Sequence, residues 1–553
     1  MSFETPDGDD TKPTESKTIT AQDEDHKYPS TAVALTILVS CLFSMFLISL
    51  DRTIIGTAIP QITKEFHSVN DIGWYGSAFM LTTCSVQLLY GRIYKLFPVK
   101  YVFIVAIAVF EIGSAVCGAA PSSNALIVGR AIAGAGAAGI MSGVMQILVH
   151  VVPLEKRPLF AGLFGAVGGI SAVVGPLLGG VFTERLSWRW CFYINLPFGA
   201  VSVTAVMVLM KNFKPLEGSL PLRQKLSLLD LTGTTVFVPC MTCLILALEW
   251  GGDTYAWNNW RIILLFIIFG VLFLAWLAIQ AWKQEDATLP PRIFFQRSIV
   301  AGFVYNTTIS ASLMIVVYYL PLWFQAVKGQ NPSTSGVSVL PSILSLVVAS
   351  ILSGVFTQRV GYYWPPMNAS PILASVGAGL LTTLKVDTGH SKWIGFQVLF
   401  GLGAGLGLQQ ATLAAQAVLR GPDISTGISV IFFGQQLGGA IFLAIAETIF
   451  DQKLANSLQD IPGANADAII KAGAADLQND VPAFVLPQVL SAYNNAVTAT
   501  LYLATGAACI TLIPALFIEW KNIKSKKKDT GTNVSSTIGS RGKEGTKDPG
   551  SEA

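Results

Sequence analysis

The sequence predicts an all-α polytopic membrane protein, because it is rich in apolar residues, poor in charge and divided into long apolar runs. Of its 553 residues, 52% are hydrophobic and 12% are charged, whereas a soluble globular chain carries roughly 25% charged residues. Many of the charges lie in the two ends, 1–30 and 521–553, so the part between them is more apolar still. A soluble multidomain enzyme is therefore excluded.

Fourteen apolar runs approach the length of about 20 residues that a helix needs to cross a bilayer. Six lie in the first part of the chain, near 31–58, 72–91, 101–120, 125–149, 160–182 and 191–210. Two follow, near 230–249 and 261–282. The last six lie near 298–322, 335–357, 364–384, 393–418, 424–449 and 497–520.

A weak internal repeat divides these runs into two halves. Gly91 ends the second run and Gly354 ends the tenth, each with basic residues in the next turn. Arg130 in the fourth run and Gln397 in the twelfth are each followed by glycine four residues later. Internal repeats of this kind are typical of secondary transporters, whose binding site lies between the halves near the middle of the membrane.

The predicted domain order follows from this division. We expect a disordered tail (1–30), a six-helix bundle (31–210), a loop (211–229), two additional helices (230–282), a loop (283–297), a second six-helix bundle (298–520, with an external connection at about 450–496) and a basic tail (521–553). When the connections between the runs are assigned alternately to the two sides of the membrane, lysine and arginine are about twice as frequent on one side. The side with more positive charge is the cytoplasmic one, which places both termini and both loops in the cytoplasm. We expect a monomer in the lipid bilayer of the plasma membrane, with a vacuolar or vesicle membrane as the alternative.

Charged residues inside the apolar runs are the first candidates for function, since each costs roughly 2.5–3.5 kcal/mol to insert. Asp51 and Arg52 interrupt the first run. Glu111 lies within the third run and Arg130 within the fourth. Because a carboxyl group in a low-dielectric cavity can load and release a proton near neutral pH, we predict that these four residues couple protons to transport. The alternative is a static ion pair of Asp51 with Arg52 or Arg130. Glu447 is expected to be a solvated carboxylate near an interface.

The fifth run has small residues on one face, with glycines recurring from Gly162 to Gly180 at spacings that include three and four. Such a face lets a neighbouring helix approach closely. Pro176 lies within the same face and bends the helix. A bend beside a smooth face favours a helix that moves against its neighbour, whereas static packing explains the glycines but not the proline.

Four of these segments resemble motifs of the major facilitator superfamily, and within it of the fourteen-span drug:proton antiporters. They are Asp51–Pro60, Gly91–Lys100, Leu126–Ala138 and Gly175–Gly180. The resemblance implies the fold of that family, two six-helix halves plus two central helices, and a proton gradient as energy source without a cofactor. It also implies conformational roles for Gly91, Arg92, Lys95, Gly134, Gly175, Pro176, Gly179 and Gly180. Three further segments are similar to the fungal branch that exports toxins and secondary metabolites, namely Phe110–Ser114, Cys117–Ser122 and Trp188–Pro197.

One loop departs from the family pattern. The motif that begins at Gly91 usually has Asp at its fifth position, where this chain has Lys95, and a second Gly where it has Pro98. Since a lysine cannot supply the negative charge of an aspartate, we expect the usual charge contact between the halves not to form in the same way.

Polar and aromatic residues inside the runs are candidates to line a substrate cavity. They are Trp74, Gln87, Gln146, Tyr305, Asn306, Tyr318, Gln409, Gln410, Gln435 and Gln436. Amides and aromatic rings with few cations suit a neutral or weakly polar organic molecule. Alternatively, the amides pair between helices and the rings form interfacial belts. No glycosylation is expected, because the sequons at Asn306 and Asn368 lie at membrane depth and the sequon at Asn533 lies in the cytoplasmic tail.

These features together predict a proton-coupled antiporter that exports hydrophobic small organic molecules, such as a fungal secondary metabolite, a mycotoxin or a drug. An uptake permease or siderophore carrier is the alternative, because fold does not fix direction. A membrane-embedded enzyme is disfavoured, since the four histidines are scattered and neither a metal-ligand motif nor a nucleotide-binding Gly-x4-Gly-Lys-Ser/Thr is present. The lack of a basic stripe with interleaved aromatic residues argues against a nucleic-acid partner.

Overall fold

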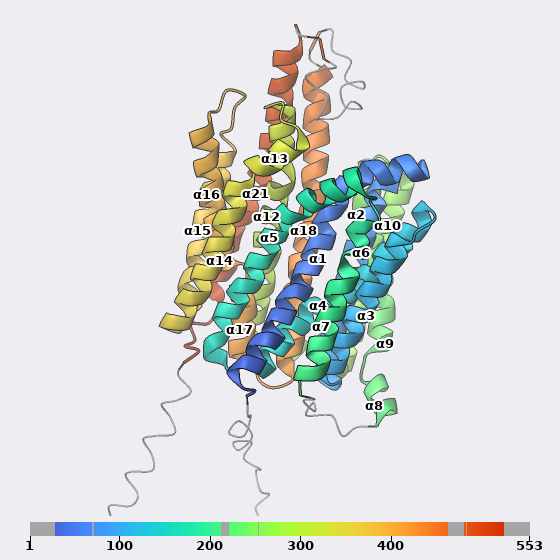
Figure 1. Ribbon diagram of the computed structural model, residues 1–553, viewed down its shortest axis with the longest axis vertical. Coiled ribbons are helices and arrows are strands. Elements are labelled where there is room, and N and C mark those ends of the chain that lie inside the picture. Colours follow the sequence, from blue (N-terminus) through green and yellow to red (C-terminus); the bar gives the residue numbers. More distant parts are fainter. Residues whose placement is uncertain are drawn as a thin grey trace, which may run out of the picture.

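The computed structural model describes residues 28–68, 71–211, 221–252, 254–459, 461–462, 481–482 and 484–524. Within these ranges the chain is a bundle of long helices without a β-strand (Figure 1). Large parts of the predicted tails, of the first loop and of the external connection lie outside the described residues, namely 1–27, 212–220, 463–480 and 525–553.

The N-terminal half contains seven helical segments. They are α1 (Thr31–Phe66), α2 (Ile72–Leu96), α3 (Val99–Gly118), α4 (Ser123–Val151), α5 (Arg157–Arg185), α6 (Trp190–Tyr193) and α7 (Asn195–Leu209). The predicted sixth run is therefore divided between α6 and α7. α1 packs against α5 and α7, while α4 packs against both α2 and α3.

The C-terminal half has a related arrangement. Its helices are α12 (Arg297–Ala326), α13 (Pro332–Ser338), α14 (Leu340–Val360), α15 (Trp364–Leu381), α16 (His390–Gly407), α17 (Gln410–Val418), α18 (Asp423–Gln459) and α21 (Leu486–Phe517). α12 packs against α18 and α21, while α16 packs against α14 and α15. The two halves meet where α5 packs on α14 and where α2 packs on α18.

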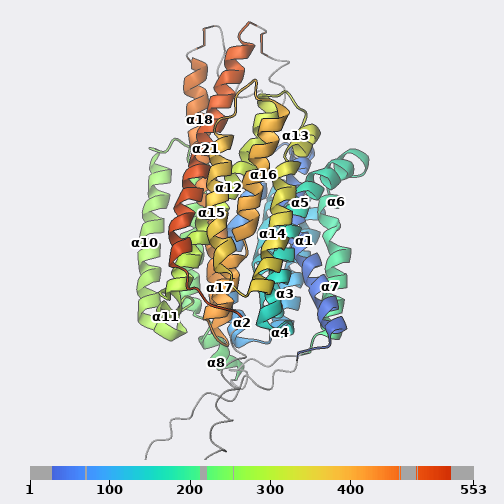
Figure 2. The ribbon, with the colours of Figure 1, turned by 90° about the vertical axis from the view of Figure 1, so that its left-hand side faces the viewer.

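The additional helices lie at the edge of this bundle. They are α8 (Leu222–Ser227), α9 (Leu231–Trp250), α10 (Trp260–Lys283) and α11 (Pro291–Phe294). α9 packs against α10 and α2, which leaves α10 on the outside (Figure 2). In the most apolar stretch of α10, only 11% of the residues are buried inside the protein. A helix that is apolar on its exposed sides needs a lipid environment.

A buried carboxylate joins the two additional helices. Asp230 caps the first turn of α9 by accepting a hydrogen bond from the Gly233 N–H (2.9 Å), and it forms an ion pair with Lys283 at the end of α10 (2.8 Å). It also accepts hydrogen bonds from the backbone and the hydroxyl of Thr288, both at 2.8 Å. Because these donors satisfy its oxygens, Asp230 can be fully buried and fix α9 to α10.

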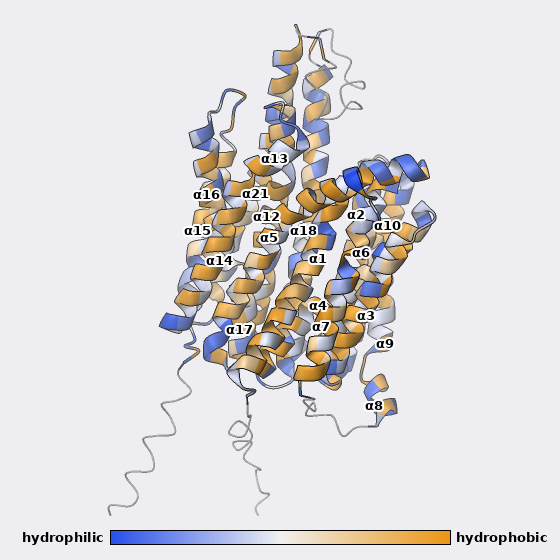
Figure 3. Cartoon of the chain, viewed as in Figure 1, coloured by the Kyte–Doolittle hydropathy of each residue, from blue (hydrophilic) through white to orange (hydrophobic). Residues whose placement is uncertain are grey.

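All fourteen predicted runs coincide with helices, and the predicted all-α fold is confirmed. By length and composition, twelve of the described helices can cross a membrane. α2 and α15 fall outside that set, since α2 carries weakly apolar and polar residues such as Trp74 and Gln87 and α15 begins with Trp364-Pro-Pro366. The count of fourteen spans stays a prediction. Apolar residues predominate along the middle of the helices, and many polar residues lie near their ends (Figure 3).

Two helices extend farther than predicted. α18 continues to Gln459 and α21 begins at Leu486, so both enter the predicted connection of about 450–496. They pack against each other and project beyond the other helices (Figure 1, Figure 2). Leu458 on α18 and Val489 on α21 are fully buried in the same apolar cluster. Burial of such side chains stabilises helix beyond the predicted ends.

The start of α1 and the end of α21 lie at the same end of the bundle, which we call the terminal end (Figure 1). The projecting ends of α18 and α21 mark the opposite, distal end.

We predict that the terminal end faces the cytoplasm. In a variant without native cysteines, Asn456→Cys near the distal end of α18 should react with an impermeant maleimide in intact cells. Lys521→Cys, after α21, should react only once the cells are permeabilised. Both positions are exposed in the structure. Labelling of Lys521→Cys in intact cells would contradict the orientation.

Candidate functional site

A buried ion pair lies within the N-terminal half. Asp51 of α1 and Arg130 of α4 form this pair, with side chains 0% and 1% exposed. Arg130 Nε also donates a hydrogen bond to the Tyr75 carbonyl of α2 (2.8 Å), and the guanidinium lies 4.6 Å from the centroid of the Phe79 ring. An unpaired charge in such a place costs several kcal/mol. The pairing therefore links α1, α2 and α4 through groups that stabilise one another.

Asp51 has a second partner that the sequence analysis did not single out. Asn195 Nδ2 donates hydrogen bonds to Asp51 Oδ1 (3.2 Å) and to Ser114 Oγ (3.1 Å). Asn195 is fully buried at the start of α7, directly after the break that separates α6 from α7. The signal in the sequence is an amide in an otherwise apolar helix start, Asn195-Leu-Pro197.

Arg52 points in a different direction from its neighbour Asp51, because successive residues of a helix are about 100° apart. Its guanidinium donates a hydrogen bond to Gln436 Oε1 of α18 (3.3 Å), across the boundary between the halves. Of the two partners predicted for a static pair with Asp51, the structure selects Arg130 rather than Arg52. One turn of α1 thus carries both Asp51, which pairs within the N-terminal half, and Arg52, which contacts the C-terminal half.

Glu111 lies apart from the ion pair, between α3 and α7. A methyl group at Gly199 of α7 would collide with the Glu111 carboxyl group, so this glycine provides the space that the carboxyl occupies. Both carboxyl oxygens are buried and have no hydrogen-bond partner among the described residues. The structure therefore brings Asp51 and Arg130 together and places Glu111 at a separate helix contact.

The contact between α2 and α18 is close and polar. A Cβ atom at Gly91 would lie 2.9 Å from the Ser429 Cβ, so only glycine fits there without movement. Gln87 donates a hydrogen bond to Ser142 Oγ (2.6 Å), and the hydroxyls of Ser142 and Ser429 lie 3.2 Å apart. These hydrogen bonds extend from α2 through α4 to the other half.

The glycines of α5 serve two different contacts. Gly162 faces α14, where its carbonyl accepts a hydrogen bond from Ser350 Oγ (2.9 Å). Gly175 and Gly179 instead face α1 in their own half, against Thr53 and Ile54 respectively. Gly134 likewise lets α4 approach α2. The predicted smooth face is therefore divided between a contact across the halves and a contact within one half.

Lys95 lies in the last turn of α2, at the position where the family motif usually has an aspartate. Lys95 forms an ion pair with Asp423 at the start of α18 (3.5 Å), and both side chains are largely buried. We expected the usual contact not to form in the same way. A contact between the halves does form, with the positive charge on α2 and the negative charge on α18.

Helix α11 and the connection that precedes it join this ion pair. Arg292 contacts Asp423 at 2.9 Å and Glu285 at 2.7 Å. Hydrogen bonds to these two carboxylates raise the pKa of Arg292 above its ordinary value. Arg92 of α2 lies 3.9 Å from Asp286 in the same connection. The additional helices are thereby tied to the place where α2 and α18 meet.

The structure separates the cavity candidates into groups. Those that donate hydrogen bonds within one half are Gln87, Tyr305, Asn306 and Gln410. A buried amide atom without a hydrogen-bond partner in the described chain remains on Gln87, Gln146, Asn306, Gln409 and Gln436. Trp74 packs against Trp250 of α9, Gln435 is half-buried and Tyr318 is exposed. Each of these five amides therefore keeps one polar atom that could bond a ligand.

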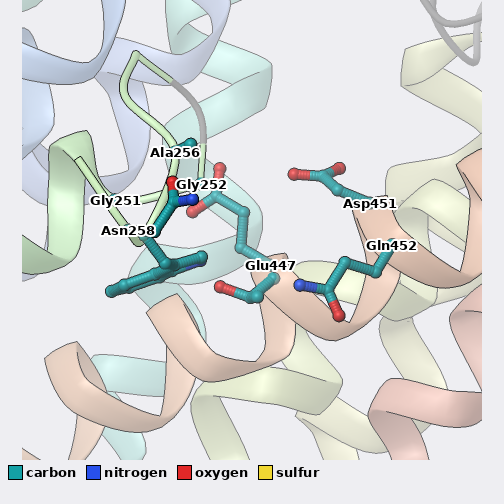
Figure 4. Close-up of a pocket in the computed structure, with 9 residues that line it drawn as sticks. Gly251, Gly252, Ala256, Asn258, Glu447, Asp451 and Gln452 are labelled. Atoms are coloured by element: carbon teal, nitrogen blue, oxygen red, sulfur yellow. The ribbon is translucent and has the colours of Figure 1, made fainter.

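A pocket of about 390 Å³ lies beside the distal part of α18 (Figure 4 shows the residues that line it). It is formed by the connection between α9 and α10 and by one face of α18, which contributes Glu447 and Asp451. Glu447, predicted as a carboxylate near an interface, is therefore part of this pocket. Within the described ranges, no group of three or more His, Cys, Asp or Glu side chains is placed to hold a metal ion.

The polar contacts between the halves lie from the middle of the bundle to the terminal end. Arg52 meets Gln436 near the middle of α1, whereas the pairs of Lys95 with Asp423 and of Ser350 with Gly162 lie nearer the terminal end. The structure therefore represents a conformation that is closed at the terminal end.

Two helical halves that meet at close glycine contacts, with a buried ion pair in one half, define a membrane transporter. Residues 41–443 match the family profile described as Major Facilitator Superfamily, and the chain belongs to this superfamily. It is a transporter rather than an enzyme.

The chain resembles several curated fungal transporters along most of its length. It is 48% identical to the MFS-type efflux pump MFS1 of Trichophyton rubrum, covering 90% of this chain and 93% of the relative. It is 44% identical to the rubrofusarin-specific efflux pump aurT of Gibberella zeae (91% and 92% covered) and 45% identical to the efflux pump aflT of Aspergillus parasiticus (89% and 96%). Its fold matches the human organic anion transporter MFSD10 with a TM-score of 0.57 at 13% identity, covering 88% of this chain and 99% of that one.

We predict that the pair of Lys95 with Asp423 stabilises closure of the terminal end. Lys95→Asp should lower the rate of export about fivefold, since a partly buried pair contributes roughly 1 kcal/mol. Adding Asp423→Lys should restore part of the rate, although Arg292 then faces a like charge. Lys156→Asp, an exposed charge change at the same end, is the control. Equal rates for the single and double variants, measured in inverted vesicles, would contradict this role.

We predict that the contact of Gly175 with α1 must stay open for transport. Gly175→Leu should reach the membrane but export less than a tenth as fast, because the side chain overpacks against Thr53 and costs roughly 1–3 kcal/mol. Pro176→Ala should have a milder effect. Gly168→Leu on the same helix is the matched control, since a Cβ there meets nothing within 4 Å. Full export by Gly175→Leu would show that the contact tolerates filling.

Proposed function

We propose that this protein is a proton-coupled antiporter of the fourteen-span drug:proton group, which exports hydrophobic small organic molecules from the cytoplasm. The observation that carries the proposal is the buried pair of Asp51 with Arg130. An ionisable pair inside membrane helices is costly and marks a functional site by default. Its carboxylate can be neutralised by one proton, which removes the attraction that holds α1 to α4.

The relatives support a small-molecule substrate. Two of the similar proteins are named efflux pumps and a third a rubrofusarin-specific efflux pump, at 44–48% identity over about nine tenths of this chain. The free amide atoms of Gln146, Gln409 and Gln436 suit a neutral organic molecule with several oxygen or nitrogen atoms. We propose a fungal secondary metabolite, toxin or drug as the substrate.

The position of Arg52 explains how protonation would reach the substrate path. Asp51 is held by Arg130 and Asn195 inside the N-terminal half, while the next residue contacts Gln436 of the other half. Protonation of Asp51 would weaken its pairing with Arg130 and free this turn of α1 to move. Movement there would disturb the contact between the halves, as alternating access requires.

One proton per substrate is sufficient for resistance. A membrane potential contributes about 2.3 kcal/mol per elementary charge per 100 mV. At 1.36 kcal/mol per factor of ten, exchange of one proton for a neutral molecule sustains a gradient of roughly 50-fold. We place the termini in the cytoplasm and the protein in the plasma membrane, so that export leads out of the cell.

We predict that Asp51→Asn abolishes uphill export in proteoliposomes with an imposed proton gradient, while downhill counterflow survives. The asparagine copies the protonated shape but cannot release a proton. Because this variant leaves Arg130 unpaired, Asp51→Asn with Arg130→Gln is the second arm. It removes both charges and relieves the unpaired cation.

The two arms separate proton coupling from a static role. If the pair only orders the bundle, the neutral double variant should pump uphill again. If it couples protons, the double variant should fold and exchange substrate but not concentrate it. Glu111→Gln tests the second candidate, and normal uphill export by both Asp51→Asn and Glu111→Gln would reject coupling through these groups. Accumulation of substrate inside cells would instead indicate an uptake permease.

A further inference from the structure

The packing of α7 against α1 and α3 places Asp51 and Glu111 at two successive contacts of α7. Asn195 Nδ2 uses its two hydrogens on Asp51 Oδ1 (3.2 Å) and Ser114 Oγ (3.1 Å). Both Asn195 and Ser114 are fully buried. Ser114 accepts this bond on α3, one helical turn after Glu111, and residues three apart share a helix face.

The next contact along the same pair of helices is shaped around Glu111. Gly199 lies one turn after Asn195 on α7, and any side chain there would occupy the place of the Glu111 carboxyl. Helices α3 and α7 thus meet at two contacts one turn apart, Ser114 with Asn195 and Glu111 with Gly199.

The two carboxyl groups have unequal surroundings. Asp51 has a cationic partner in Arg130 and a donor in Asn195, whereas the buried oxygens of Glu111 have no hydrogen-bond partner among the described residues. An ionised carboxylate without such partners is strongly disfavoured away from water. The polar atoms of Asp51 are therefore satisfied in this conformation, whereas those of Glu111 are not.

We propose that Asn195 and Ser114 are positioning residues that make Asp51 and Glu111 one proton-handling unit. The proposal rests on the proposed proton coupling and adds to it the residues that connect its two acids. The titratable groups close to Asp51 are Arg52 on α1, Glu111 and Cys117 on α3, Arg130 on α4 and Cys191 on α6. Among the described hydrogen bonds, those of Asn195 connect Asp51 to the helix that carries Glu111.

The test uses Asn195→Leu, which keeps the size of the side chain and removes its hydrogen bonds. The pH of half-maximal uphill export in proteoliposomes should move to higher pH by about one unit, tenfold in proton concentration, because the ionised Asp51 loses a donor. Ser114→Ala should move it less in the same direction. Ser202→Ala is the matched control, because Ser202 is equally buried on α7 and bonds the Ser40 carbonyl of α1 (3.2 Å) without touching a carboxyl.

A double-variant cycle separates a connecting role from a structural one. The shift caused by Asn195→Leu should be clearly smaller when Glu111→Gln is present: the direct loss of a donor to Asp51 remains, but its coupling to a second titrating acid is removed. An equal shift in both backgrounds, or no shift in folded Asn195→Leu protein, would overturn the proposal.

Should Asn195→Leu fail to fold, Ser114→Ala replaces it, and its pH shift is compared in the wild-type and Glu111→Gln backgrounds. A wild-type protein that exports uphill with no pH dependence would instead reject the proposed function itself, which keeps the two failures distinct.

Discussion

The buried pair of Asp51 and Arg130 is the interaction on which the N-terminal half depends. Removing two charges from water is unfavourable unless each finds a partner and its remaining polar atoms are bonded. Arg130 satisfies this condition through the Tyr75 carbonyl and Asp51 through the Asn195 amide. Four helices, α1, α2, α4 and α7, are therefore held in register by polar groups that would be costly to separate.

Close packing of backbones is the second constraint, because lipid gives little hydrophobic drive for one helix to join another. Gly91 allows α2 to meet α18, and Gly162 allows α5 to meet α14. Around these contacts, Lys95 and Asp423 add a charge pair at the terminal end. Small residues set how closely the halves approach, and the polar groups fix their register in the conformation seen here.

The same features connect the structure to transport. A major facilitator protein must hold one end closed and then exchange that closure for the other. Here the closed end is held by an ion pair, serine contacts and glycine packing. The additional helices contribute through Arg292 of α11, which joins the pair of Lys95 with Asp423.

By itself, the sequence determined the helical class, the positions of the long helices and the residues whose charge had to be explained. These follow from apolar length and from the cost of burying charge, both of which are local properties of the chain. Only the tertiary structure decided that Asp51 pairs with Arg130, that Arg52 donates a hydrogen bond to Gln436, and that Asp423 forms an ion pair with Lys95. Such pairs depend on how each helix is rotated and packed against distant segments. Helix rotation is set by contacts far apart in the chain, which hydropathy and spacing do not encode.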